Sequence, residues 1–157
     1  MDMDTFVAVA TLCAPLVHPI TAQAIVATES AFDPDAIGVV AGRLERQPRN
    51  VAEAVATARA LNAQGVNFSV GLAQINVNNL RRFGLSLADG FDACQNMKAM
   101  QLVLGHCYER ASADDGEQLS LRRALSCYYS GNFTTGFRHG YVSRVVNTVQ
   151  KTARAPP

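Results

Sequence analysis

Apolar side chains recur at helical spacing in several separate stretches of the chain. Residues 20–32 carry such a pattern, and it ends at Asp33-Pro34, because the residue before a proline avoids helical backbone angles. The longest pattern runs over residues 93–111 and follows Asp92, a residue type that caps helices. Both stretches are therefore predicted to be α-helices.

Polar cap residues predict further helices. Asn50 is followed three residues later by Glu53, which is the spacing of a capping box that opens a helix over 51–62. Ser120 is predicted to cap a helix over 121–130, and a last helix is expected over 141–151.

The connecting segments are short and rich in glycine. They leave room for a little β-structure between Gly38 and Val70 and for a short helix over 76–80. The predicted fold class is mainly α with minor β. At 157 residues the chain suits one hydrophobic core, so we expect a single domain over 1–151 and a tail over 152–157.

Composition excludes several classes of function. The chain has 14 Lys or Arg against 13 Asp or Glu, and this net charge of +1 is too small for a dedicated nucleic-acid binder. The charge is uneven, since residues 119–157 carry bases and no acid. No apolar run reaches the ~18 residues that a membrane span needs, and no glycine-rich phosphate loop occurs. No cofactor is predicted.

The four cysteines are Cys13, Cys94, Cys107 and Cys127, and they lack the close spacing of a zinc site. No metal is therefore predicted. Their spacing is compatible both with two disulfides and with four buried thiols of a cytosolic protein.

Glu29 is the carboxylate that points most directly to chemistry. It ends an apolar stretch beside Ile25, Val26 and Phe32. Burial among such side chains raises the pKa of a carboxyl and favours a protonated acid near neutral pH. The alternative is a solvated charge on the polar face of the helix.

Amides and aromatic residues supply candidate binding groups. Gln74 and Asn76 follow a glycine at position 71 and offer amides of the kind that bind sugar hydroxyls and acetamides. Tyr128 precedes a small polar segment, and Tyr141 opens the last predicted helix. Taken singly, each is equally compatible with a turn, core or surface role.

In their order along the chain these segments resemble the soluble lytic transglycosylase (SLT) domain, which has a lysozyme-like fold. The matching segments are Glu29-Ser30, Gly71-Leu72-Ala73-Gln74-Ile75-Asn76, Tyr128-Tyr129-Ser130-Gly131-Asn132 and Tyr141-Val142. The chain departs from the family pattern in two places. Ala73 stands where methionine is commoner, and Tyr129 stands where many members have asparagine.

More narrowly, the chain resembles the lytic transglycosylase subunit of bacterial type IV secretion systems. Three stretches carry this likeness, namely the segment 91–96, the segment 126–133 and the long segment 36–70, with its Ile37-Gly38-Val39-Val40, Arg43-Leu44 and Arg46-Gln47-Pro48. The resemblance implies a periplasmic protein that opens peptidoglycan for the secretion channel. The implied partners are glycan strands and other channel components, and the protein is expected to be a monomer. No signal peptide is evident in this chain.

The resemblance also assigns roles to the candidate residues. Glu29 is expected to act first as acid and then as base on the bond between N-acetylmuramic acid (MurNAc) and N-acetylglucosamine (GlcNAc), closing a 1,6-anhydro ring. Ser30, Gln74 and Tyr141 are expected to position substrate or Glu29. Asn76 and Tyr128 are expected in the groove. The rivals are a true muramidase hydrolase, a non-catalytic glycan-binding scaffold and a cytosolic helical interaction domain.

A periplasmic location favours disulfides over thiols. Cys94 and Cys107 lie on one predicted helix, ~20 Å apart, which is too far to bridge. We favour Cys13–Cys94 with Cys107–Cys127, of which the first would tie the N-terminal segment to the start of the long helix, as in related secretion-associated enzymes. The remaining alternative is Cys13–Cys107 with Cys94–Cys127.

Overall fold

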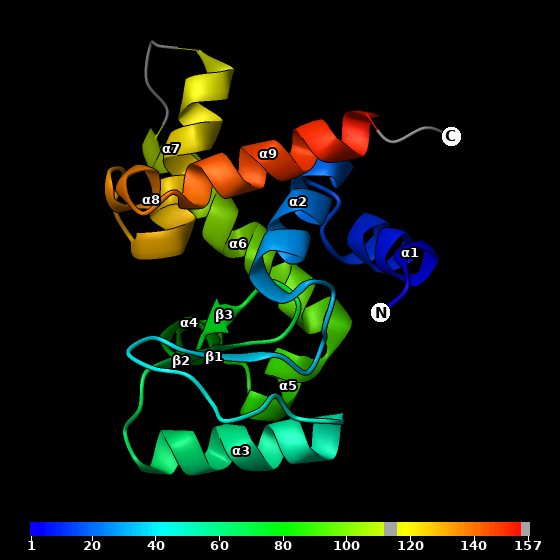
Figure 1. Ribbon diagram of the computed structural model, residues 1–157, viewed down its shortest axis with the longest axis vertical. Coiled ribbons are helices and arrows are strands. Elements are labelled where there is room, and N and C mark those ends of the chain that lie inside the picture. Colours follow the sequence, from blue (N-terminus) through cyan, green and yellow to red (C-terminus); the bar gives the residue numbers. More distant parts are fainter. Residues whose placement is uncertain (112–115, 155–157) are drawn as a thin grey trace. The chain divides into compact units, whose positions relative to one another are not determined.

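Helices form most of the protein, and a small sheet lies among them (Figure 1). The computed structural model describes residues 1–111 and 116–154. These residues group into two compact units, and the boundary between them falls after Met100, inside helix α6 (Ala93–Ala111). The predicted fold class, mainly α with minor β, is confirmed.

The first unit contains the sheet and the helices that precede α6. Its elements are α1 (Met3–Cys13), α2 (Pro19–Ser30), β1 (Ile37–Val39), α3 (Val51–Ala63), β2 (Phe68–Val70), β3 (Ile75–Asn76), α4 (Val77–Arg82) and α5 (Leu87–Phe91). The strands form an antiparallel sheet in the order β1-β2-β3, in which Val70 lies opposite both Ile37 and Ile75. Strands β1 and β2 lie where β-structure was expected, and β3 lies just beyond.

The predicted capping box of α3 is only half formed. The Asn50 side chain accepts a hydrogen bond from the Glu53 amide at 3.0 Å, as expected. The Glu53 carboxylate does not return to Asn50. It accepts from the Arg49 amide at 2.8 Å and pairs with the Arg46 guanidinium. This hydrogen bond to Arg46 and the one from Arg49 lower the pKa of Glu53 to about 2.

A disulfide joins the end of α1 to the beginning of α6. Cys13 and Cys94 have Cα atoms 5.3 Å apart and sulfurs 2.07 Å apart, so the favoured pairing is confirmed. The core beside it is contributed by both helices and strands. Its fully buried large side chains include Phe6, Ile25, Phe68, Leu72, Ile75, Leu80 and Met97.

Asn96, on α6, is a buried polar residue that organises the turn after β2. Its Nδ2 donates to the carbonyls of Val70 (2.9 Å) and Gly90 (2.8 Å), and its Oδ1 accepts from the Ala73 amide at 2.9 Å. Gly71 has a φ of 77°, and a Cβ there would lie 2.3 Å from Asn96 Nδ2. The turn therefore needs both this asparagine and this glycine.

We expect Asn96→Ala to destabilise the protein by at least about 2 kcal/mol, because it removes three buried hydrogen bonds made by the Asn96 side chain. Urea denaturation would measure the change. Asn147→Ala, on an exposed position of the last helix, is the matched control and should change stability by no more than ~0.5 kcal/mol. Equal effects for the two variants would contradict the role given to Asn96.

The second unit contains the rest of α6 together with α7 (Glu117–Ser130), α8 (Thr135–Arg138) and α9 (Tyr141–Arg154). The prediction that Ser120 caps α7 was wrong, because the helix begins at Glu117. Ser120 is buried, and its amide donates to the Gly116 carbonyl as part of the helix. Helix α9 continues three residues beyond the predicted end at Lys151.

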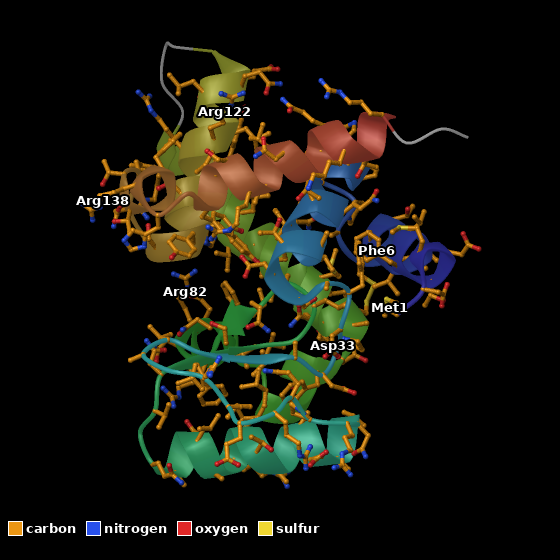
Figure 2. All side chains as sticks on the ribbon, viewed as in Figure 1. Met1, Phe6, Asp33, Arg82, Arg122 and Arg138 are labelled. Carbon is orange, nitrogen blue, oxygen red and sulfur yellow. A yellow bond between two sulfur atoms is a disulfide. The ribbon has the colours of Figure 1, made fainter. Side chains whose placement is uncertain are left out.

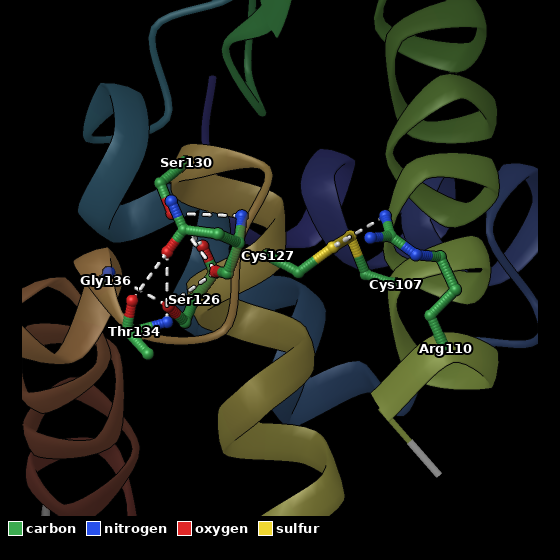
Figure 3. Close-up of a disulfide and its surroundings, with 8 residues drawn as sticks. Cys107, Arg110, Ser126, Cys127, Ser130, Thr134 and Gly136 are labelled. Carbon is green, nitrogen blue, oxygen red and sulfur yellow. Dashed lines mark hydrogen bonds between the residues drawn. A yellow bond between two sulfur atoms is a disulfide. The ribbon is translucent and has the colours of Figure 1, made fainter.

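Figure 3 shows the second disulfide and the turn that follows α7. Cys107 and Cys127 have Cα atoms 5.7 Å apart, which confirms the other favoured pair. Ser126 immediately precedes Cys127, and its Oγ donates to the Asn132 carbonyl at 2.9 Å and accepts from the Gly136 amide at 2.9 Å. These bonds hold α8 closely against α7, with space for glycine only at position 136.

Within the parts of the chain that the structure describes, the helices are too short or too polar to cross a membrane.

Candidate active site

A pocket of about 420 Å³ opens beside the C-terminal end of α2, within the first unit. Its walls come from the end of α2 and the loop after it, from β1, from the segment before α3 and from the turn between β2 and β3. The residues of chemical interest that line it are Glu29, Ser30, Asp33, Gly38, Gln47 and Gln74. The fold thus brings together three predicted site residues, Glu29, Ser30 and Gln74.

Glu29 is half-buried at the next-to-last position of α2. The helix ends abruptly after it, because Ala31 and Phe32 have positive φ angles of 51° and 65°. Such a conformation costs a non-glycine residue of order 1 kcal/mol, so packing must hold it. The Phe32 ring meets Phe6 of α1 edge-on, with centroids 5.1 Å apart. Figure 2 shows Asp33 just beyond this turn.

Ser30 connects the end of α2 to the turn after β2. Its hydroxyl donates to the Leu72 carbonyl at 2.7 Å and lies 3.3 Å from the Val26 carbonyl. Because the hydroxyl hydrogen is used inside the protein, Ser30 supports the backbone beside Glu29 and offers a ligand only its oxygen lone pairs.

The side chain of Gln74 is fixed by the backbone around it. Its Nε2 donates to the carbonyls of Ala36 and Gly71, both at 3.1 Å. Its Oε1 lies against Gly38, where an added Cβ would be only 2.5 Å away. Both amide hydrogens are thus used within the protein, and Oε1 is the atom left to accept a hydrogen bond from a ligand.

A second carboxylate, Asp33, lines the same pocket as Glu29. Its Oδ1 accepts from the Asp35 amide at 2.9 Å, which fixes the loop after α2. Burial, and next the negative charge of Asp33, raise the pKa of the Asp35 carboxyl above its usual value. Across residues 1–111 and 116–154, no His, Cys, Asp or Glu side chains gather in threes to hold a metal ion.

Asn76 has a structural role and is not part of the pocket lining. Its Oδ1 caps α4 by accepting from the Asn78 amide at 3.0 Å, and its Nδ2 donates to Asn67 Oδ1 at 2.8 Å. Both ends of its amide are thus used within the first unit.

Tyr128 and Tyr141 belong to the second unit. Tyr141 is buried at the start of α9, and its ring stacks on that of Tyr129, with centroids 4.7 Å apart and planes 15° apart. The Tyr129 hydroxyl lies 3.1 Å from His139 Nδ1. Tyr128 is half-buried. The residue that departs from the family's asparagine, Tyr129, is therefore the stacking partner of Tyr141.

Sequence reasoning did not identify Gln47 as a pocket residue. It lies in a loop of polar and charged residues without a periodic pattern, and its sequence signal is confined to the likeness of that segment to secretion-system enzymes.

Comparison with known proteins agrees with this architecture. The family model "Transglycosylase SLT domain" matches residues 8–146, and SLT domains are lysozyme-like and mainly α. The chain is 47% identical over 159 residues to the type IV secretion system protein VirB1 of Brucella suis biovar 1, a match covering 97% of this chain and 67% of that protein. It is 39% identical over 141 residues to protein VirB1 of Agrobacterium fabrum, covering 88% and 57% of the two chains.

No solved structure matches the chain significantly. The family match nevertheless spans nearly all of it, and the VirB1 proteins match across both compact units. The chain belongs to the transglycosylase SLT domain family, in the group of the VirB1 proteins of type IV secretion systems.

Proposed function

We propose that this protein is a lytic transglycosylase that cleaves the β-1,4 bond between MurNAc and GlcNAc in peptidoglycan and releases a 1,6-anhydro-MurNAc end. The observation that carries the proposal is the position of Glu29. It is half-buried in a pocket that the family's Ser30 and Gln74 motif residues also line.

In this mechanism Glu29 acts twice. Its protonated carboxyl donates a proton to the glycosidic oxygen, and the bond from that oxygen to C1 of MurNAc breaks as the oxygen keeps the electron pair. The resulting carboxylate then removes the proton from the 6-hydroxyl of the same MurNAc. The O6 atom bonds to C1, Glu29 is protonated again, and no water is consumed. One group that reverses its role in this way needs no second carboxylate.

The neighbouring residues support this chemistry in different ways. Ser30 holds the end of α2 to the Leu72 peptide and so positions Glu29. Gln74 presents Oε1 as a fixed acceptor for a hydroxyl or amide N–H of the sugar. We assign Tyr141 to positioning and Tyr128 to the groove on the family motif. Asn76, also a groove residue by that motif, supports the turn that carries Gln74.

The relatives named as type IV secretion system proteins support a role in opening the cell wall for such a system. The two disulfides suit an oxidising compartment, which favours the periplasm. Glycan strands would be the substrate, and other components of the secretion channel the partners of a monomeric enzyme.

The charge distribution also suits this substrate. Residues 119–157 carry six bases and no acid, and Arg122 and Arg138 are exposed on the second unit (Figure 2). The stem peptides of peptidoglycan carry carboxylates, so these bases favour its approach.

The second candidate is hydrolysis, and Asp33 favours it because this carboxylate lines the same pocket as Glu29. A retaining hydrolase uses a second carboxylate as nucleophile, and an inverting one uses it to activate water. Either reaction would add a water at the cleaved bond.

Mass spectrometry of digested peptidoglycan distinguishes the two reactions. We expect muropeptide ends that are lighter by one water than reducing ends, as a 1,6-anhydro ring requires. Reducing ends alone would establish a hydrolase. Binding of glycan with no cleavage would instead indicate a scaffold role.

A further inference from the structure

The side chain of Gln47 binds both backbone groups of one strand residue. Its Oε1 accepts from the Ile37 amide at 2.8 Å, and its Nε2 donates to the Ile37 carbonyl at 2.9 Å. A primary amide carries its C=O and one N–H on the same side, so it matches a residue whose own N–H and C=O point the same way. Gln47 therefore pairs with β1 as a neighbouring strand would.

The Ile37 groups are available because β1 is an edge strand. It pairs on one side only, with β2, in the order β1-β2-β3. The backbone carbonyl of the preceding residue, Ala36, faces β2, because it accepts a hydrogen bond from the Gly71 amide at 2.9 Å. By the alternation of an antiparallel pair, the Ile37 N–H and C=O face the open edge. Gln47 satisfies both of them.

This contact holds the middle of the segment 40–50, which leads from β1 to α3. The far end of the segment is fixed to α3 by the bonds of Glu53 to Arg49 and Arg46. The near end is fixed by the Val40 amide, which donates to the Asn67 carbonyl at 3.1 Å. Among the hydrogen bonds of the described residues, those of Gln47 alone connect a side chain of this segment to β1.

The same contact forms part of the pocket wall. Gln47, Ile37 and Gly38 all line the pocket that contains Glu29. Gly38 in turn lies against Oε1 of Gln74. A shift of β1 or of the segment 40–50 would therefore change both the shape of the wall and the position of the Gln74 acceptor.

We propose that Gln47 is a positioning residue that latches the segment 40–50 onto β1 and thereby sets the affinity of the pocket for the glycan strand. This inference rests on the proposed function. Gln47 acts on the wall and leaves the proton transfer at Glu29 untouched. Removal of the Gln47 side chain should thus weaken binding of the substrate and of the transition state equally. This raises KM and leaves kcat nearly unchanged.

The test compares Gln47→Ala and Gln47→Glu with the control Gln64→Ala, which alters an exposed glutamine at the end of α3. Amide hydrogen exchange by NMR measures this contact, and we expect about tenfold faster exchange at Ile37 in Gln47→Ala. Gln47→Glu keeps an oxygen that can accept from the Ile37 amide and loses only the donor to the Ile37 carbonyl, so its effect on exchange should be smaller. Titration with a chitin tetrasaccharide measures glycan binding, and we expect Kd to rise about tenfold. On peptidoglycan we expect KM to rise about tenfold while kcat changes less than about threefold.

The possible outcomes separate this inference from the proposed function. Unchanged exchange at Ile37 would show that no latch exists, and faster exchange with unchanged Kd and KM would show that the latch does not shape the pocket. Either result overturns the inference even if the wild type cleaves peptidoglycan. If neither the wild type nor Gln64→Ala cleaves it, the proposed function fails, while the exchange and tetrasaccharide measurements still decide on Gln47.

Discussion

Glu29→Gln is expected to lower the rate of peptidoglycan cleavage by at least about 10²-fold, and by as much as ~10⁴-fold. The amide keeps the shape of the side chain, but it has no proton of suitable acidity to give and no carboxylate with which to take one back. Because Glu29 would carry out both transfers, the substitution removes acid and base together. The rate of release of soluble muropeptides from purified sacculi would measure the effect.

Two further variants test whether the loss of cleavage is specific to Glu29. Glu117→Gln alters an exposed glutamate in the first turn of α7 and should leave the rate unchanged. Asp33→Asn keeps the Oδ1 atom that accepts from the Asp35 amide, so the loop should remain in place. A small effect of Asp33→Asn fits a single acid/base at Glu29. A loss as large as that of Glu29→Gln would point to a hydrolase with two carboxylates.

Removal of the Cys13–Cys94 disulfide should have the largest effect on stability. The bond closes a sequence separation of 81 residues, for which chain entropy gives a loss of about 4.5 kcal/mol. The Cys107–Cys127 bond closes a separation of 20 residues, for which the loss is about 3.3 kcal/mol. The measurement is urea denaturation of the two double alanine variants. The first variant should have the lower unfolding midpoint.

The first disulfide also bears on the pocket. Cys94 lies two residues before Asn96, whose side chain holds the turn that leads to Gln74. We therefore expect the Cys13→Ala/Cys94→Ala variant to lose cleavage activity at a lower temperature than the Cys107→Ala/Cys127→Ala variant. The reverse order in stability would show that loop length does not govern the contributions of the two bonds. Reduction of both disulfides in the wild-type protein should lower its stability by about the sum of the losses in the two double alanine variants.

Local patterns predicted the main helices well. The apolar spacing of α6 reflects burial of one face of the helix, which sequence records directly. The helix end at Gly131 was also predictable, because its φ of 80° suits glycine. Helix-capping predictions from local sequence were wrong where a polar side chain could form its hydrogen bonds elsewhere. Ser120 has the chemistry of a cap but is buried inside α7, and Glu53 binds Arg46 and does not complete the capping box with Asn50.

The candidate site was predictable only in part. Glu29, Ser30 and Gln74 stand in ordered motifs, and the fold places them on one pocket. Asn76 stands in the same motif, but its amide is used to cap α4. The stacking of Tyr129 on Tyr141 joins residues on separate helices, so no local pattern could reveal it.

By itself the sequence determined the helical class, the candidate acid Glu29 and the cysteines available for pairing, because periodicity and residue chemistry are properties of the chain. Tertiary structure alone decided which side-chain donors and acceptors already form hydrogen bonds within the protein. It bound Gln74 Nε2 and the Ser30 hydroxyl within the protein, and it brought Gln47 to the edge of β1. These contacts join segments up to 42 residues apart, and their geometry exists only when the chain is folded.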